Sequence, residues 1–263
     1  MYPYLRLGPF LLQLPLLALL VGVWIGSALA EKEAARLKLS TTIVNNLAFV
    51  GLIAGIVGAR LAYAVRYLQV YLENPLSLFA LNVNTLAGFD GLLIGVVVAA
   101  FYGWRKKLPL RPTLDALAPG LAAFMVALGV SHFLSGDAFG TPARLPWSIY
   151  LWSEYRQPSQ VYETLAALGI FFAIYKKPLG QAGDGINFLL VVALLSAART
   201  FLEAFRGDSV IWPGGFRAAQ VVGLIVLAIT LYTMRIWTQT GKPATTESQP
   251  GFLKQISVNH DFS

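Results

Sequence analysis

The sequence contains no cysteine and few charged residues. Without cysteine the chain cannot form a disulfide, a thiolate metal site or a covalent thiol intermediate, so any reacting thiol must belong to a partner. Charged residues make up 13% of the 263 residues and hydrophobic residues 56%, whereas a soluble domain has about 25% charged residues. This composition indicates a membrane protein. Because the few charges lie between long apolar runs, the net charge of +7 does not indicate a nucleic-acid partner.

Seven stretches are long and apolar enough to cross a bilayer, which takes about 20 residues. We therefore expect an all-α polytopic membrane protein with seven transmembrane helices. The segment EKEAARLKL after the first stretch is charged and lacks a small-residue cleavage site, so we expect that stretch to be retained rather than removed as a signal peptide. The seven stretches lie near residues 9–30, 43–65, 86–104, 113–131, 158–175, 184–205 and 216–237.

Basic residues predict the orientation of these helices, because cytoplasmic loops carry excess lysine and arginine. One set of alternate loops holds twelve of the 20 basic residues and the other set holds six. This places the N-terminus outside and the C-terminus inside. All lysines then lie inside, and the outward or buried basic residues are arginines, which suit a lipid phosphate because the guanidinium forms paired hydrogen bonds. The positive-inside bias alone also accounts for the inward lysines.

The polar segments divide the chain further. Residues 1–237 are expected to form the transmembrane domain, with an interfacial helix in an external arm over 66–85 and a small external cap over 132–157. Residues 238–263 are polar and are expected to be a disordered cytoplasmic tail.

Three ionisable residues near the end of the sixth stretch share a helix face in the sequence ARTFLEAFR. Arg199, Glu203 and Arg206 are spaced i, i+4 and i+7. They form either a structural ion-pair ladder or, since two arginines face one carboxylate, an anion site. Arg60, in GIVGARLAY with Tyr63 one turn further on, either serves a site or extends its guanidinium to the interface.

Three more polar positions are candidates for chemistry. Glu163 shares a helix face with Gln160 in RQPSQVYE, or is simply a favourable acid near a helix N-terminus. Asp90, in GFDGLLIG, is either functional or an N-cap. His132, in GVSHFLSGDAFG, lies at the membrane edge and is a candidate base near neutral pH.

The motifs GARLAY, FDGLLIG, RQPSQVYE and ARTFLEAFR, in this order, resemble those of the bacterial prolipoprotein diacylglyceryl transferase family. The resemblance covers roughly residues 8–237. It implies an enzyme of the bacterial cytoplasmic membrane with seven helices and no metal or organic cofactor. Such an enzyme moves diacylglycerol from phosphatidylglycerol to the lipobox cysteine thiol of an exported preprolipoprotein and releases glycerol 1-phosphate. The implied partners are phosphatidylglycerol, the signal-peptide-bearing preprolipoprotein and membrane lipids.

The resemblance also implies which residues form the site. We expect Arg60 and Arg199 to hold the phosphate and to stabilise the charge that develops on it. Glu203 is expected to act with Arg199 in catalysis. The positions expected to bind substrate are Arg60, Tyr63, Arg206, Gln160, Tyr162, Glu163 and Gly140.

The chain departs from the family pattern at several motif positions. Asp90 stands where the family has the histidine of a His-Gly-Gly motif, Gly129 replaces the arginine of a second signature, and His132 replaces an asparagine there. Either Asp90 or His132 takes over deprotonation of the thiol, or the chain is a divergent relative that binds phospholipid or uses another acceptor. A third alternative is a transporter. A transporter would be expected to have paired broken helices and two halves of similar sequence, and neither is clear in the sequence.

Overall fold

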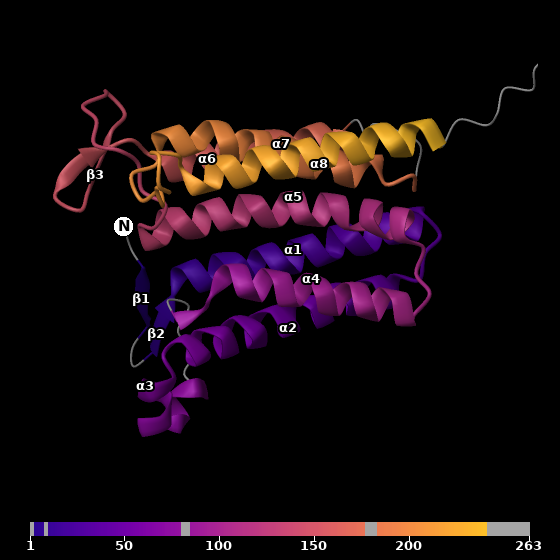
Figure 1. The fold of residues 1–263 in the computed structure, drawn as a ribbon, viewed down its shortest axis with the longest axis horizontal. Helices are drawn as coiled ribbons and strands as arrows, with labels where there is room; N and C mark the ends of the chain where they lie inside the picture. The colour runs from indigo at the N-terminus through magenta and orange to yellow at the C-terminus, as the bar shows by residue number, and fades with distance from the viewer. Residues whose placement is uncertain (1–2, 8–9, 80–84, 177–182, 241–263) are drawn as a thin grey trace, which may run out of the picture.

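A computed structural model of the chain describes residues 3–7, 10–79, 85–176 and 183–240. Seven long helices run side by side, and Figure 1 shows α5 between α1 on one side and α6, α7 and α8 on the other. The helices are α1 (Leu14–Arg36), α2 (Thr41–Arg66), α4 (Gly88–Arg105), α5 (Leu110–Ser135), α6 (Ser159–Lys176), α7 (Ile186–Leu202) and α8 (Ala218–Thr240).

Six described helices, α1, α2, α4, α5, α7 with its extension to Phe205, and α8, are long and apolar enough to cross a membrane. The chain is therefore a multi-pass membrane protein. The helix α6 does not meet the same criterion, because its first turns carry Gln160 and Glu163. The seventh span and the predicted orientation stay predictions.

The first span differs from the prediction of 9–30 at both ends. Residues before it form an antiparallel hairpin of β1 (Tyr4–Leu7) and β2 (Phe10–Gln13), and α1 begins at Leu14. Pro15 lies in the first turn of α1, where its missing N–H costs no hydrogen bond. The helix continues through the charged segment to Arg36, since Glu, Lys, Ala and Arg are strong helix formers.

Glycines bring the helices together in two close pairs, α1 with α5 and α2 with α4. A Cβ atom added at Gly120 of α5 would lie 2.5 Å from the carbonyl oxygen of Gly26 in α1. One added at Gly91 of α4 would lie 2.6 Å from the carbonyl oxygen of Gly55 in α2. Both close approaches therefore require glycine, which has no side chain, and small residues are common where membrane helices cross closely.

The predicted interfacial helix over 66–85 is broken into two short pieces. The helix α2 continues to Arg66, α3 (Leu68–Glu73) has six residues, and a 3₁₀ helix η1 (Pro75–Phe79) follows. Pro75 disfavours helical backbone at the residue before it, and Asn74 is accordingly non-helical, with φ of −139° and ψ of 81°. Residues 80–84 lie outside the described part of the chain, and we call the described pieces over 68–79 the arm.

The predicted cap over 132–157 begins later than expected, because α5 continues to Ser135 and includes His132. Gly136 ends α5 in the left-handed conformation, with φ of 83°. A hairpin of β3 (Ile149–Leu151) and β4 (Glu154–Arg156) follows. It lies at the same end of the bundle as β1, β2 and α3 (Figure 1).

At the opposite end of the bundle a buried carboxylate fixes the start of α7. The side chain of Asp115 on α5 accepts hydrogen bonds from the backbone N–H groups of Gly183, Gly185 and Phe188, at 3.2, 2.9 and 3.2 Å. It thus satisfies N–H groups that a helix N-terminus leaves free. The helix α8 ends at Thr240, and the predicted disordered tail lies otherwise outside the described residues.

Candidate functional site

A small cavity lies between α5, α6 and α7. Each helix contributes residues at i, i+3 and i+4 spacing, so that one stripe of each helix faces the cavity. Its volume is about 90 Å³. Most of the lining is apolar, and the charged or titratable residues are His132, Glu163 and Arg199. The complete lining is Met125, Leu128, Gly129, His132, Glu163, Ala166, Ala167, Leu195, Ala198, Arg199 and Leu202.

Gly129 allows α5 and α6 to approach each other at this cavity. A Cβ atom at Gly129 would lie 2.4 Å from the Thr164 hydroxyl oxygen and 3.0 Å from the Thr164 Cα atom. The close approach places His132, one turn further along α5, beside Glu163 of α6. Position 129, where the related signature has an arginine, therefore has no room for any side chain.

Glu163 lies at the centre of a cluster of charged side chains. Its Oε1 atom accepts hydrogen bonds from Nη1 of Arg199 and from Nη1 of Arg206, both at 2.8 Å. Its Oε2 atom lies 3.3 Å from Nδ1 of His132. Glu203 joins this cluster as well, since its Oε2 atom lies 2.9 Å from Nη2 of Arg199. The structure thus brings together five residues predicted from three separate motifs.

Arg206 does not continue the helix that carries Arg199. The helix α7 ends at Leu202, a 3₁₀ turn η3 (Glu203–Phe205) follows, and Arg206 is extended. The expected single helix face of i, i+4 and i+7 is therefore wrong at its third position. Arg206 still points to the same cluster, and its Nε and Nη2 atoms also donate to both carboxylate oxygens of Asp208, at 2.9 and 2.6 Å.

The charge balance of this cluster differs from the expected surplus of one arginine. Glu163 and Asp208 join Glu203, so two arginines face three carboxylates. The surplus is lost partly through tertiary packing, because Glu163 joins the two arginines from another helix, α6. The cluster consequently has no excess positive charge with which to bind anions in general. A phosphate that binds here must displace a carboxylate from an arginine or share the arginine with it.

The two arginines of the cluster have different environments. The Arg199 side chain is 37% exposed and lines the cavity, whereas the Arg206 side chain is 11% exposed. Burial of the Arg206 guanidinium lowers its pKa, but the hydrogen bonds to Asp208 and the charge of Glu163 outweigh burial and hold the pKa above its usual value. Arg206 therefore stays charged, and Arg199 is the arginine that a ligand in the cavity meets.

Three other predicted site residues surround the cluster without lining the cavity. Gln160 is fully buried, and its Nε2 atom donates to the carbonyl oxygen of Asp137 at 2.9 Å. The Tyr162 hydroxyl accepts a hydrogen bond from Trp147 Nε1 at 2.8 Å. Gly140 pairs with Arg206 across an antiparallel bridge. These contacts join the cap to α6 and to the turn after α7.

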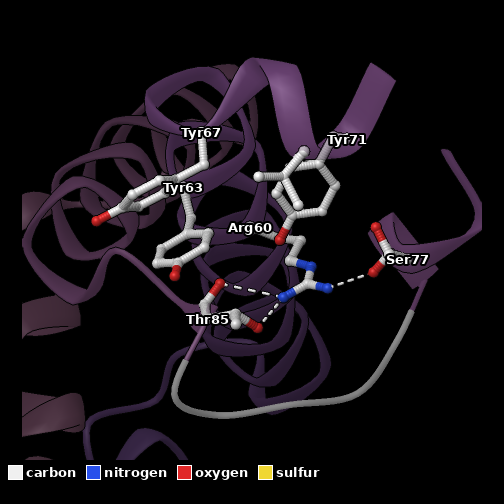
Figure 2. Close-up of a pocket in the computed structure, with 7 residues that line it drawn as sticks. Arg60, Tyr63, Tyr67, Tyr71, Ser77 and Thr85 are labelled. Carbon is white, nitrogen blue, oxygen red and sulfur yellow. Dashed lines mark hydrogen bonds between the residues drawn. The ribbon is translucent and has the colours of Figure 1, made fainter. Parts of the chain in front are cut away.

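Arg60 and Tyr63 lie in a different pocket, between α2 and the arm. Figure 2 shows the rings of Tyr63, Tyr67 and Tyr71 around one side of the Arg60 guanidinium. This pocket has a volume of about 290 Å³. It shares no lining residue with the cavity at Arg199, so within the described residues the two arginines do not form one pocket.

The donors of Arg60 are used within its own part of the chain. Nε donates to the carbonyl oxygen of Leu78 at 3.0 Å and Nη2 to that of Ser77 at 2.5 Å. Nη1 donates to the carbonyl oxygen of Thr85 at 3.2 Å and also to its hydroxyl (Figure 2). Arg60 thus joins η1 and Thr85 to α2.

Asp90 lies apart from the cavity, in the first turn of α4. Ala87, not Asp90, is the N-cap of this helix. The Asp90 carboxylate pairs with Arg66 of α2, with Oδ2 2.6 Å from Nη2. Asp90 therefore joins the ends of two helices and does not line the cavity at His132.

Sequence reasoning missed several residues that hold the cluster in place. Asp208 follows Arg206 by two residues, a spacing that marks a local ion pair. Arg217 donates from Nη1 to the carbonyl oxygens of Glu203 and Arg206, both at 2.7 Å, and no pattern in the sequence predicts bonds to backbone carbonyls. The described residues contain no group of three His, Cys, Asp or Glu side chains that could hold a metal ion.

Comparison with known proteins agrees with this arrangement of motifs. The family model for prolipoprotein diacylglyceryl transferase matches residues 4–236. The chain belongs to the prolipoprotein diacylglyceryl transferase family. Among its relatives, a protein of Clostridioides difficile named phosphatidylglycerol–prolipoprotein diacylglyceryl transferase is 28% identical over 204 residues, covering 78% of this chain and 82% of the relative.

Two further relatives carry the same name. The protein of Streptococcus uberis is 27% identical over 246 residues, covering 88% of this chain and 93% of the relative. The protein of a Nostoc species is 26% identical over 242 residues, covering 86% of this chain and 85% of the relative. The similarity to the transferase family thus includes every helix that lines the cavity.

Proposed function

We propose that the chain transfers the diacylglyceryl group of phosphatidylglycerol to the cysteine thiol of an exported prolipoprotein in the bacterial cytoplasmic membrane. Relatives that are similar to this chain over most of their length carry the name of this activity. One observation supports placing this reaction at a particular site in the fold. The cavity between α5, α6 and α7 is apolar, and the half-exposed Arg199 lies at its charged edge.

This lining matches the two chemically different parts of the lipid. An apolar wall suits the glyceryl and acyl portion, and a guanidinium suits the phosphate. We assign the phosphate contact to Arg199, whose Nε atom makes no hydrogen bond to any described residue. A guanidinium placed here stabilises the negative charge that the leaving phosphate gains as the carbon–oxygen bond breaks.

The neighbouring charged residues position Arg199. Glu163 and Glu203 contact its two terminal nitrogens and fix the plane of the guanidinium. Arg206 offsets part of their negative charge and is itself held by Asp208. We assign Glu203 and Arg206 to positioning, since the side chains of both are mostly buried and neither lines the cavity.

Two measurements test the function. Expression of the chain should restore lipoprotein modification in a bacterium depleted of its own transferase. The purified protein in phosphatidylglycerol vesicles should transfer the diacylglyceryl group to a lipobox peptide with one cysteine, and Arg199→Ala should lower this rate about 10²–10³-fold, the usual effect of removing one donor to a developing charge. Phosphatidylglycerol binding without transfer by the native protein would contradict the proposal, and full activity of Arg199→Ala would remove Arg199 from it.

A further inference from the structure

His132 occupies a position at the cavity that combines exposure with a fixed orientation. It lies in the last turn of α5, and its side chain is 28% exposed. Its Nδ1 atom faces Glu163 Oε2 at 3.3 Å. The other ring nitrogen, Nε2, makes no hydrogen bond within the described part of the chain, so one nitrogen is held and the other is available.

The contact with Glu163 determines which nitrogen carries the proton in the neutral ring. An ionised carboxylate only accepts hydrogen bonds, so Nδ1 must donate and Nε2 carries the lone pair. Both oxygens of Glu163 already have donors, because Oε1 accepts from Arg199 and Arg206. This arrangement of a carboxylate that orients an imidazole is the general form of a positioned base.

We propose that His132 is the general base that deprotonates the acceptor thiol, with Glu163 as its positioning residue. The proposal rests on the transferase function given above. His132 Nε2 takes the thiol proton as the S–H bond breaks and an N–H bond forms. The thiolate sulfur then bonds to the terminal glyceryl carbon, the bond from that carbon to the phosphate oxygen breaks, and the phosphate leaves with the electron pair. The imidazolium returns its proton to the leaving phosphate or to water.

The other groups near the cavity are less suited to this step. Arg199 is permanently protonated and cannot accept a proton. Glu163 has both oxygens engaged by cationic or ring donors. Asp90, the alternative base considered from the sequence, is paired with Arg66 on other helices and does not line the cavity. His132 is thus the one cavity-lining side chain among the described residues that has an unengaged basic atom.

The substitution His132→Asn provides a sharp test, because it restores the residue that the related signature has at this position and preserves polarity. The native protein and this variant are compared in phosphatidylglycerol vesicles with two lipobox peptides, one with cysteine and one with selenocysteine. A selenol is ionised at neutral pH and needs no base. With the cysteine peptide we expect the variant to be about 10²–10⁴-fold slower, the usual contribution of a positioned base. With the selenocysteine peptide we expect the variant and native rates to lie within about tenfold of each other.

Equal rates of both proteins with the cysteine peptide would overturn the proposal. An equal loss with both peptides would also overturn it, because it would show that His132 supports the structure of the site rather than the proton transfer. Asp90→Asn is the matched control and should leave the ratio between the two peptides unchanged. No transfer by the native protein to either peptide would reject the transferase function itself, and His132 as a base with it.

Discussion

Two arginines of the helical bundle, Arg60 and Arg199, resemble each other in sequence and differ in what they contact. Both lie in predicted membrane spans, near the side of the membrane that is predicted to be outside. Arg60 donates to carbonyl oxygens of Ser77, Leu78 and Thr85. Arg199 contacts the carboxylates of Glu163 and Glu203 at the edge of a cavity.

The two guanidinium groups therefore differ in the kind of acceptor that they contact, backbone carbonyl oxygens for Arg60 and carboxylates for Arg199. The acceptors of Arg60 are backbone carbonyl oxygens of η1 and Thr85. If Arg60 gave up these hydrogen bonds to bind a ligand, η1 and Thr85 would lose their attachment to α2. The Glu163 carboxylate beside Arg199 also contacts two other side chains, those of Arg206 and His132. Arg199 can therefore exchange its contact with Glu163 for a phosphate, because Glu163 keeps its contacts with Arg206 and His132.

The largest expected effect comes from matched Arg→Lys substitutions at the two positions. Arg199→Lys keeps the charge but loses the paired donors, so we expect transfer to fall about 10²-fold or more. Arg60→Lys should lower transfer less than about tenfold, because the cavity at Arg199 does not include it. Rates measured in phosphatidylglycerol vesicles check this, and a greater loss at Arg60 would reverse the assignment.

The arm offers a second way to separate the two arginines. Arg60→Ala removes the donors that join η1 and Thr85 to α2, so the backbone over residues 68–79 should open more often. We expect amide hydrogen exchange there to become about tenfold faster, a change of about 1.4 kcal/mol in local stability.

Arg199→Ala is the matched control for the arm, and it should leave exchange over residues 68–79 unchanged. Unchanged exchange in Arg60→Ala would contradict the structural role of Arg60.

A smaller effect is expected at Asp208. Asp208→Asn removes one charge next to Arg206 but keeps an oxygen that can accept one of its hydrogen bonds. Because Arg206 also contacts Glu163, we expect transfer to fall about two- to tenfold, the usual effect of losing one hydrogen bond. A loss as large as that of Arg199→Ala would show that Asp208 acts directly in the site.

The smallest effect is expected for the Asp90–Arg66 pair. The Arg66 side chain is largely exposed, so Asp90→Asn should change the free energy of unfolding by about 0.2–1 kcal/mol. Thermal unfolding in detergent, combined with Arg66→Ala in a double-mutant cycle, measures this contribution. Transfer should stay near the native rate, and its loss would restore Asp90 as a candidate base.

The sequence predicted six of the spans correctly, because each of the corresponding described helices is a long apolar run. It also grouped Arg199, Glu203 and Arg206 from one motif, and the resemblance to the family added Glu163 together with Arg60, Gln160 and Tyr162. It failed at Arg206, where a 3₁₀ turn replaces the helix, and at the first span, where charged helix formers extend α1 to Arg36. Local composition does not determine where a helix ends once tertiary contacts compete with it.

The separation of Arg60 from Arg199 could not be predicted for a related reason. Its cause is a set of carbonyl acceptors in the arm, and every residue has a carbonyl group. The loss of the expected charge surplus depends on Glu163 and Asp208, which join the cluster from α6 and from the turn after α7. Only the packing of α5, α6 and α7 shows which charges face one another.

The central claim is that the lipid reacts at the cavity between α5, α6 and α7. The most direct test is a phosphatidylglycerol analogue with a photoreactive group on its headgroup glycerol, activated in vesicles that contain the native protein. We predict that mapped crosslinks fall on the ends of these helices, within residues 128–135, 163–167 and 195–206. Crosslinks confined to residues 60–77 would contradict this account and would place the lipid headgroup in the pocket at Arg60.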